Sequence, residues 1–308
     1  MPVSPSLASL SLTHYLGVKK SIDDRALNPR VWAELVHAIS AVPRPRVLEV
    51  GCGIGTMLER MIERELLSSA DYLGVDLSEE NIMEAPGRLA SWAEASGYTA
   101  TAEPGGVRIT GRGASIAAEF AKVDVFDFLE IPGGKSTWDL LVAHAFLDLV
   151  HIPSALQQML PALKPGGLFY FSLVFDGLTV LEPELDRSLD SQIMALYHRT
   201  MDQRTRRGLP SGDSRSGRHL FQHLRDAGAE LIEAGGSDWV VFPRGGTYSQ
   251  AEIQFLDWIL RFIESSLAGH PELEANFFED WIEQRREQLV RTELVYIAHQ
   301  LDFLGRLG

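Results

Sequence analysis

The sequence predicts an α/β fold, with a doubly wound, mostly parallel sheet covered by helices on both faces. The first observation is a strand, a glycine-rich loop and a helix in succession over residues 47–67. The second is a pair of further apolar runs, residues 71–76 and 138–143. The third is a strongly apolar run that follows a Lys-Pro-Gly-Gly turn and ends at residue 174. Apolar runs that alternate with helical patterns are typical of parallel strands buried on both faces.

The composition is that of a globular protein with a full core. Of the 308 residues, 45% are hydrophobic, and the formal net charge is −14. An acidic surface repels phosphate backbones, so nucleic acid is not expected as a partner. No apolar window is long enough for a membrane span, and the first residues do not resemble a signal peptide. With one cysteine, Cys52, no internal disulfide can form. We therefore expect a cytoplasmic protein that makes no membrane contact.

The chain begins with a segment that precedes the sheet. Residues 14–41 have apolar side chains at helical spacing, interrupted by a turn at Asn28-Pro29. Pro43 and Pro45 end this segment. We predict an N-terminal helical cap over residues 1–42, followed by one domain over residues 43–308.

The central feature is the loop between the first strand and its helix. Gly51, Gly53 and Gly55 stand at alternate positions, and helical spacing begins at Thr56. Glycines let the backbone turn sharply and lie against a ligand, while the helix N-terminus offers free N–H donors. The loop is therefore suited to a nucleotide-like ligand. Cys52 lies within it, where a small side chain is needed, so packing or ligand contact is expected rather than nucleophilic chemistry.

The second strand, residues 71–76, ends at Asp76. An acidic residue at this point of nucleotide-binding α/β folds accepts hydrogen bonds from two ribose hydroxyls. Ser78 is the expected N-cap of a helix over residues 78–96, which Pro86-Gly87 interrupts and divides into two short pieces. Residues 97–118 predict an inserted hairpin or an irregular excursion.

Two further strands lead to candidate site residues. The strand from residue 118 ends near Asp124, with Asp127 as a close competitor because the strand end is not defined by the sequence. The strand over residues 138–143 ends at His144, at the edge where open α/β sheets place their chemistry. A histidine there suits a general base, and the alternative is a histidine that is simply hydrogen-bonded in the turn. Asp148 follows four residues after His144.

These motifs resemble those of the class I S-adenosylmethionine (SAM) dependent methyltransferases. The dinucleotide fingerprint is G-x-G-x-x-G, whereas this chain has Glu49-x-Gly-x-Gly-x-Gly55, which is similar to motif I of that family. The Leu-Lys-Pro-Gly-Gly turn over residues 163–167 is a second match. The resemblance covers residues 40–175.

The resemblance implies SAM as cofactor, S-adenosylhomocysteine (SAH) as product and no metal ion. Glu49 would anchor the charged end of SAM indirectly, and the glycines would pass under the amino acid part of SAM. Leu77 would lie against the adenine, and Asp124 with Val125 would contact the adenine amino group. His144 would contact the methionine part or act as a base. The implied cofactor-binding residues are Glu49, Gly51, Cys52, Gly53, Gly55, Asp76, Leu77, Asp124, Val125 and His144.

The family fold implies a seven-stranded, Rossmann-like sheet that closes with an antiparallel pair. Insertions at residues 176–216 and 245–292 are expected to form a substrate lid. The N-terminal helices would close over the cofactor or pack as a cap without a binding role. Amphipathic helices at 249–267 and 273–291 carry aromatic side chains that suit a substrate pocket, a homodimer contact or core packing.

The expected reaction is transfer of the sulfonium methyl group to a small-molecule acceptor, with O, N and C acceptors all open. Five arginines lie within residues 204–218. They suit either an anionic substrate or pairing with local acids. The alternatives are a protein methyltransferase that attracts a basic partner and a non-catalytic SAM- or SAH-binding assembly subunit. A nicotinamide dehydrogenase is the nearest fold-level alternative, and the glycine spacing argues against it.

Overall fold

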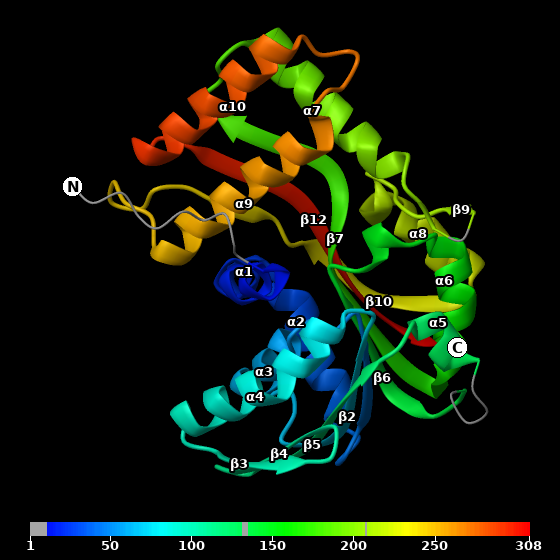
Figure 1. The fold of residues 1–308 in the computed structure, drawn as a ribbon. Helices are drawn as coiled ribbons and strands as arrows, with labels where there is room; N and C mark the ends of the chain where they lie inside the picture. The colour runs from blue at the N-terminus through cyan, green and yellow to red at the C-terminus, as the bar shows by residue number, and fades with distance from the viewer. Residues whose placement is uncertain (1–10, 131–134, 207) are drawn as a thin grey trace.

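The computed structural model describes residues 11–130, 135–206 and 208–308 (Figure 1). The first ten residues of the predicted cap and Arg207 of the arginine-rich stretch lie outside this description. The helices are α1 (Leu12–Ala26), α2 (Pro29–Ile39), α3 (Thr56–Glu63), α4 (Glu79–Ala95), α5 (Val125–Leu129), α6 (Ile152–Met159), α7 (Arg187–Asp202), α8 (Ser216–Asp226), α9 (Gln250–Leu267) and α10 (Ala275–Val290). Two short 3₁₀ helices are η1 (Leu147–Leu149) and η2 (Leu160–Ala162).

The strands form one large sheet and a short hairpin. They are β1 (Arg46–Val50), β2 (Ser69–Asp76), β3 (Thr99–Glu103), β4 (Gly106–Gly111), β5 (Ala114–Lys122), β6 (Trp138–His144), β7 (Leu163–Glu182), β8 (Thr205–Arg206), β9 (Leu209–Pro210), β10 (Ala229–Gly236), β11 (Trp239–Val241) and β12 (Val295–Leu307). The order across the large sheet is β10-β12-β7-β6-β1-β2-β5-β4-β3, and β11 pairs with β12.

The predicted fold class is confirmed. Strands β5, β2, β1, β6 and β7 are mutually parallel, β12 pairs antiparallel with β7, and β10 pairs antiparallel with β12, which gives the seven expected strands. The described sheet has ten strands because β3, β4 and β11 are added to these seven. The segment 97–118 is therefore a hairpin, β3–β4, that extends the sheet beyond β5.

Three hydrophobic cores hold these elements together. One lies between the sheet and α2, α3 and α4, and the second lies on the opposite face beneath α5, α6 and α8. The third joins α1, α7, α9 and α10 to the far halves of β7 and β12. In Figure 1 these long strands continue past the parallel sheet and carry α7, α9 and α10 around them. The upper part of the molecule is thus an extension of the sheet with its own core.

Local sequence signals explain several helix boundaries. Asn28 caps α2 by accepting hydrogen bonds from the Arg30 and Val31 N–H groups, with Pro29 in the first helical position. Ser249 and Glu252 form a capping box at the start of α9. In contrast, the expected division at Pro86 is wrong, because α4 runs unbroken through it. The buried side chains of Ala85 and Leu89 hold this helix against the sheet, and their packing outweighs the lost hydrogen bond.

Among the described helices, none combines the length and the apolar character that a membrane crossing requires.

Candidate active site

The glycine loop after β1 is shaped by backbone conformations that favour glycine. Gly51, Gly53 and Gly55 have φ values of +66°, +54° and +78°. A Cβ on Gly51 would lie 2.6 Å from the Phe146 ring, so this ring packs directly on the bare backbone. Gly55 is the N-cap of α3 and packs against Leu89, and it is not among the residues that line the cavity described below.

Asp76 joins the loop to the end of β2. Its Oδ2 accepts a hydrogen bond of 2.9 Å from the Gly53 N–H, and its Oδ1 accepts one of 2.8 Å from the Ser78 N–H. The Asn81 amide lies 3.3 Å from the same Oδ1. The carboxylate therefore fixes the position of the loop and stands at the carboxyl end of the strand, where the sequence places it.

Glu49 lies beneath the loop and is almost completely buried. It accepts a 2.6 Å hydrogen bond from the Tyr72 hydroxyl on the neighbouring strand β2. Burial raises the pKa of Glu49 to about 8, against the lowering effects of Tyr72 and Arg60. At neutral pH this carboxyl group is mostly protonated, and a cation nearby would favour its ionised form.

Asp124 is the N-cap of α5, where its Oδ1 accepts a 3.0 Å hydrogen bond from the Phe126 N–H. Its other oxygen accepts a 2.8 Å hydrogen bond from Arg206. Asp124 and Val125 line the cavity, whereas Asp127 is not among its lining residues. Strand β5 ends two residues before Asp124, so Asp124 lies nearer to the strand end than Asp127.

His144 ends β6 and belongs to a buried polar cluster. Its Nδ1 lies 2.8 Å from the Ser172 hydroxyl, and its Nε2 lies 3.1 Å from Asp23 Oδ2 on α1. Burial lowers its pKa to about 4, so the imidazole is neutral at pH 7. Both ring nitrogens are engaged within the protein, and the side chain forms part of the attachment of α1 to the sheet.

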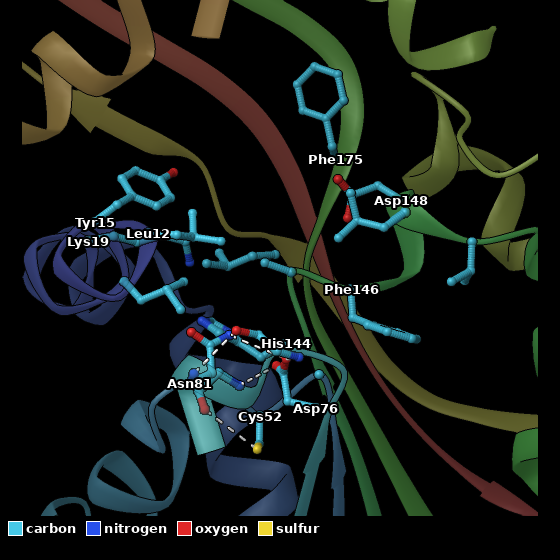
Figure 2. A pocket seen from close by; sticks show the side chains of 18 of the residues that line it. Leu12, Tyr15, Lys19, Cys52, Asp76, Asn81, His144, Phe146, Asp148 and Phe175 are labelled. Carbon is cyan, nitrogen blue, oxygen red and sulfur yellow. Dashed lines mark hydrogen bonds between the residues drawn. The ribbon is translucent and has the colours of Figure 1, made fainter. Parts of the chain in front are cut away.

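One cavity of about 600 Å³ collects these residues. Its lower part is formed by the loop, Asp76 and His144, and α1 contributes Leu12, Tyr15 and Lys19 (Figure 2). The volume lies within the range of small-ligand sites. Nine of the ten candidate cofactor residues line this cavity: Glu49, Gly51, Cys52, Gly53, Asp76, Leu77, Asp124, Val125 and His144.

Comparison with known families shows to which family the chain belongs. A family model described as a methyltransferase domain matches residues 25–234, which is more than half of the chain. The chain belongs to this methyltransferase family. It is a SAM-dependent enzyme, and SAM is its cofactor.

Solved structures of low sequence identity align with most of this methyltransferase. A SAM-dependent methyltransferase from Methanosarcina mazei is 14% identical, with 91% of this chain and 98% of that chain covered and a TM-score of 0.49. One from Thiobacillus denitrificans, in complex with SAH, is 14% identical, with 97% and 100% covered and a TM-score of 0.47. The comparison with curated proteins finds no match.

The cavity of the methyltransferase fits SAM in chemistry. Leu77 leaves 53% of its surface exposed at the end of β2 and supplies an apolar wall. The loop presents backbone without Cβ atoms, and Asp76 places a carboxylate beside it. Cys52 packs against Gly74, where a Cβ would lie 2.8 Å from its Sγ, and burial raises the pKa of its thiol. This environment disfavours the nucleophilic thiolate.

The sequence predicts the aromatic side chains of residues 249–267 as one possible pocket lining, but it does not identify the other residues of the upper part of the cavity. Aromatic side chains from six different elements meet there: Tyr15, Phe175, Tyr197, Trp239, Phe262 and Tyr296. Helical periodicity marks several of them as core residues, which is why their role in a cavity wall was not apparent. The sequence signal for this part of the cavity is Asp148, because a carboxyl residue just beyond the end of β6 lies at the edge of the sheet where ligands bind.

Two of the four described arginines of the arginine-rich stretch are paired with acids of the methyltransferase. Arg206 bonds to Asp124, and Arg218 bonds to Asp176 at 2.8 Å. Arg204 lines the cavity, and its side chain is exposed to solvent. For Arg206 and Arg218 these ion pairs agree with the interpretation of local pairing, whereas Arg204 at the cavity leaves the anionic-substrate interpretation open.

Proposed function

We propose that this SAM-dependent methyltransferase acts on a small-molecule acceptor that binds in the aromatic upper part of the cavity. The observation that carries the proposal is the continuity of this aromatic chamber with the glycine loop, within one cavity of about 600 Å³. Helices α1, α7 and α9 each contribute lining residues, namely Tyr15, Tyr197 and Phe262. A chamber walled on several sides suits a compact ligand better than a protein surface.

For the cofactor we propose contacts that follow the geometry of the lower cavity. Asp76 would bind the ribose hydroxyls, Leu77 would lie against the adenine, and Asp124 with Val125 would contact the adenine amino group. Glu49 would act indirectly from below the loop that carries Gly51, Cys52, Gly53 and Gly55. Each of these roles is supported by position at the carboxyl edge of the parallel strands, where open α/β sheets bind ligands.

For His144 we propose contact with the cofactor and no role as the general base. The support is that both ring nitrogens have partners, Ser172 and Asp23, and that burial lowers the pKa to about 4. A catalytic base works best with a pKa near the operating pH and a free lone pair toward the substrate. His144 instead positions α1 above the loop.

When bound, SAM supplies an activated methyl group together with its own leaving group. The protein's contribution is therefore alignment and exclusion of water. Phe146 and Phe175 line the cavity beyond the loop, and Tyr15 of α1 faces them from the other side (Figure 2). These side chains would orient an acceptor toward the loop.

The test is a labelling experiment with SAM that carries a deuterated methyl group. The purified protein is incubated separately with the low-molecular-weight fraction and with the protein fraction of a cell extract. Label in a small molecule, detected by mass spectrometry, is the expected result. Label in proteins alone would replace the proposal with a protein methyltransferase. SAM binding without transfer in either fraction would indicate a non-catalytic binding subunit.

A further inference from the structure

Asp148 is held in the cavity wall by the turn that follows β6. Ala145 adopts a φ of +49°, and its N–H donates a 2.8 Å hydrogen bond to the Ser172 carbonyl. The 3₁₀ helix η1 follows, with Leu147 fully buried and Leu149 exposed. A left-handed alanine is a costly backbone conformation, and such residues concentrate at functional sites. The turn directs Asp148 to the cavity.

The Asp148 carboxyl group stands out in the aromatic chamber because one of its oxygens lacks a hydrogen-bond partner within the described residues. Its Oδ1 is buried, and within the described ranges it has no hydrogen-bond partner. Figure 2 shows it between Phe146 and Phe175, across the cavity from Tyr15 and Leu12. A buried oxygen without a partner loses the free energy of its hydration, so such groups call for a ligand that supplies a donor.

The groups that surround Asp148 come from several elements. Tyr15 on α1 and Tyr197 on α7 lie close enough for the Asp148 charge to raise the pKa of both hydroxyls, in addition to the larger effect of burial. Burial also raises the pKa of Asp148, while its own backbone N–H, Arg204 and Lys19 oppose this. Lys19 is paired with Asp23 at 2.6 Å, and Arg204 reaches solvent.

We propose that the methyl acceptor is an amine and that Asp148 binds its nitrogen. This inference rests on the proposed function, because it places the acceptor in the aromatic chamber. A carboxylate among aromatic rings recognises an amine in two ways. It accepts a charge-assisted hydrogen bond from N–H, and the ring faces attract the positive charge. An anionic acceptor would instead be repelled by the negative charge of the Asp148 carboxylate.

Asp148 also acts in the transfer itself. The amine binds as the ammonium ion and transfers one proton to the Asp148 carboxylate, which releases it to solvent, so that the nitrogen lone pair is free. The lone pair forms the new bond to the methyl carbon, and the sulfur–carbon bond breaks with its electron pair left on sulfur. Positive charge develops on the nitrogen, where the Asp148 carboxylate stabilises it. The N–H proton then passes to Asp148 and on to solvent. A hydroxyl acceptor would need a stronger base than a carboxylate.

The experiment measures ligand charge preference without turnover. The protein saturated with SAH is titrated calorimetrically with 2-phenylethylamine and with 3-phenylpropionate, which have a similar shape and opposite charge. The amine is expected to bind at least about tenfold more tightly. In Asp148→Asn the preference should disappear while SAH affinity stays unchanged. Asp280→Asn, the same change on the exposed surface of α10, is the control and should keep the preference.

Three results would overturn the proposal: a preference for phenylpropionate, a preference for the amine that survives in Asp148→Asn, or no binding of either probe at millimolar concentration. The labelling experiment separates this failure from failure of the proposed function. A labelled small molecule without an amine would leave the proposed function intact and refute the role of Asp148. Label on lysine side chains of proteins would support the amine chemistry and refute the small-molecule acceptor.

Discussion

Removal of the Asp23 charge should destabilise the protein and detach α1 from the cavity. Asp23 Oδ2 accepts hydrogen bonds from Lys19 at 2.6 Å and His144 at 3.1 Å, and Arg60 lies 3.5 Å away. Its Oδ1 accepts a 3.0 Å hydrogen bond from the Trp239 indole. Asp23 is 1% exposed, so water does not reach these donors. This carboxylate therefore neutralises buried cations on two helices.

The magnitude follows from what Asp23→Asn leaves behind. Breaking one partner of a buried ion pair costs about 3–5 kcal/mol, because the remaining charge stays buried without compensation. Arg60 keeps a second partner, Asp24, whereas Lys19 has no other carboxylate partner within the described ranges. We therefore expect a loss near the lower end, about 3 kcal/mol, against a total stability of about 5–15 kcal/mol for a natural protein.

The assay is equilibrium unfolding in urea at pH 7 for wild type, Asp23→Asn and a control. Asp71→Asn is a matched control, because Asp71 pairs with Arg44 at 2.6 Å while its side chain is 51% exposed. Exposed pairs contribute less than about 1 kcal/mol. A loss below about 1 kcal/mol for Asp23→Asn, or an equal loss in both variants, would refute the reasoning.

The loss of stability caused by Asp23→Asn should depend on pH. Burial opposes ionisation of Asp23, yet Lys19, His144 and Arg60 hold its pKa well below the usual range. A carboxyl group with a lowered pKa in the folded state stabilises the protein above its ordinary pKa of 3.8 and loses this contribution as the pH falls further. The difference between wild type and Asp23→Asn should therefore be full at pH 7 and shrink in acid below pH 3.8.

Two other changes test the loop and the residue beneath it. Gly51→Ala should cost about 1–3 kcal/mol and weaken SAM binding, because φ is +66° and the new Cβ would displace the Phe146 ring. Gly87→Ala on α4 is the control, because no atom outside the neighbouring backbone lies within 4 Å of the added Cβ. In thermal melts of both variants it should be neutral or stabilising, and an equal loss of stability in both would contradict this account. For Glu49, the folded pKa of about 8 exceeds 4.5, so the folded protein holds a proton that the unfolded chain has released. The free energy of unfolding should fall more steeply between pH 5 and 8 in wild type than in Glu49→Gln, and parallel pH profiles in urea would exclude the raised pKa.

The features that sequence predicts well are those encoded in short segments. The order of strand, glycine loop and helix and the Lys-Pro-Gly-Gly turn each depend on neighbouring residues, and together they predict the parallel sheet. Asp76 could be placed because it ends an apolar run. The outcome at Pro86 differs because tertiary packing of Ala85 and Leu89 decides it, and local helix signals do not contain that information.

The features that could not be predicted depend on contacts between distant segments. Asp23 and His144 are 121 residues apart in the chain, and no pattern within α1 indicates that it docks on β6. Tyr197 and Phe262 follow helical spacing like any core residue, so the aromatic chamber becomes visible only when α7 and α9 are placed around β7 and β12. The sequence could not show whether Asp124 or Asp127 lies nearer to the strand end, because the exact end of β5 is not encoded in a local pattern.

The central claim is that the lower cavity binds SAM through Asp76. The most direct measurement is calorimetric titration with SAM, SAH and NAD of wild type, Asp76→Ala and the control Asp71→Ala, which changes the opposite end of the same strand. The account predicts micromolar binding of SAM and SAH, no binding of NAD, and at least about a tenfold loss of affinity in Asp76→Ala alone. Tight NAD binding without SAM binding, or unchanged SAM affinity in Asp76→Ala, would contradict it.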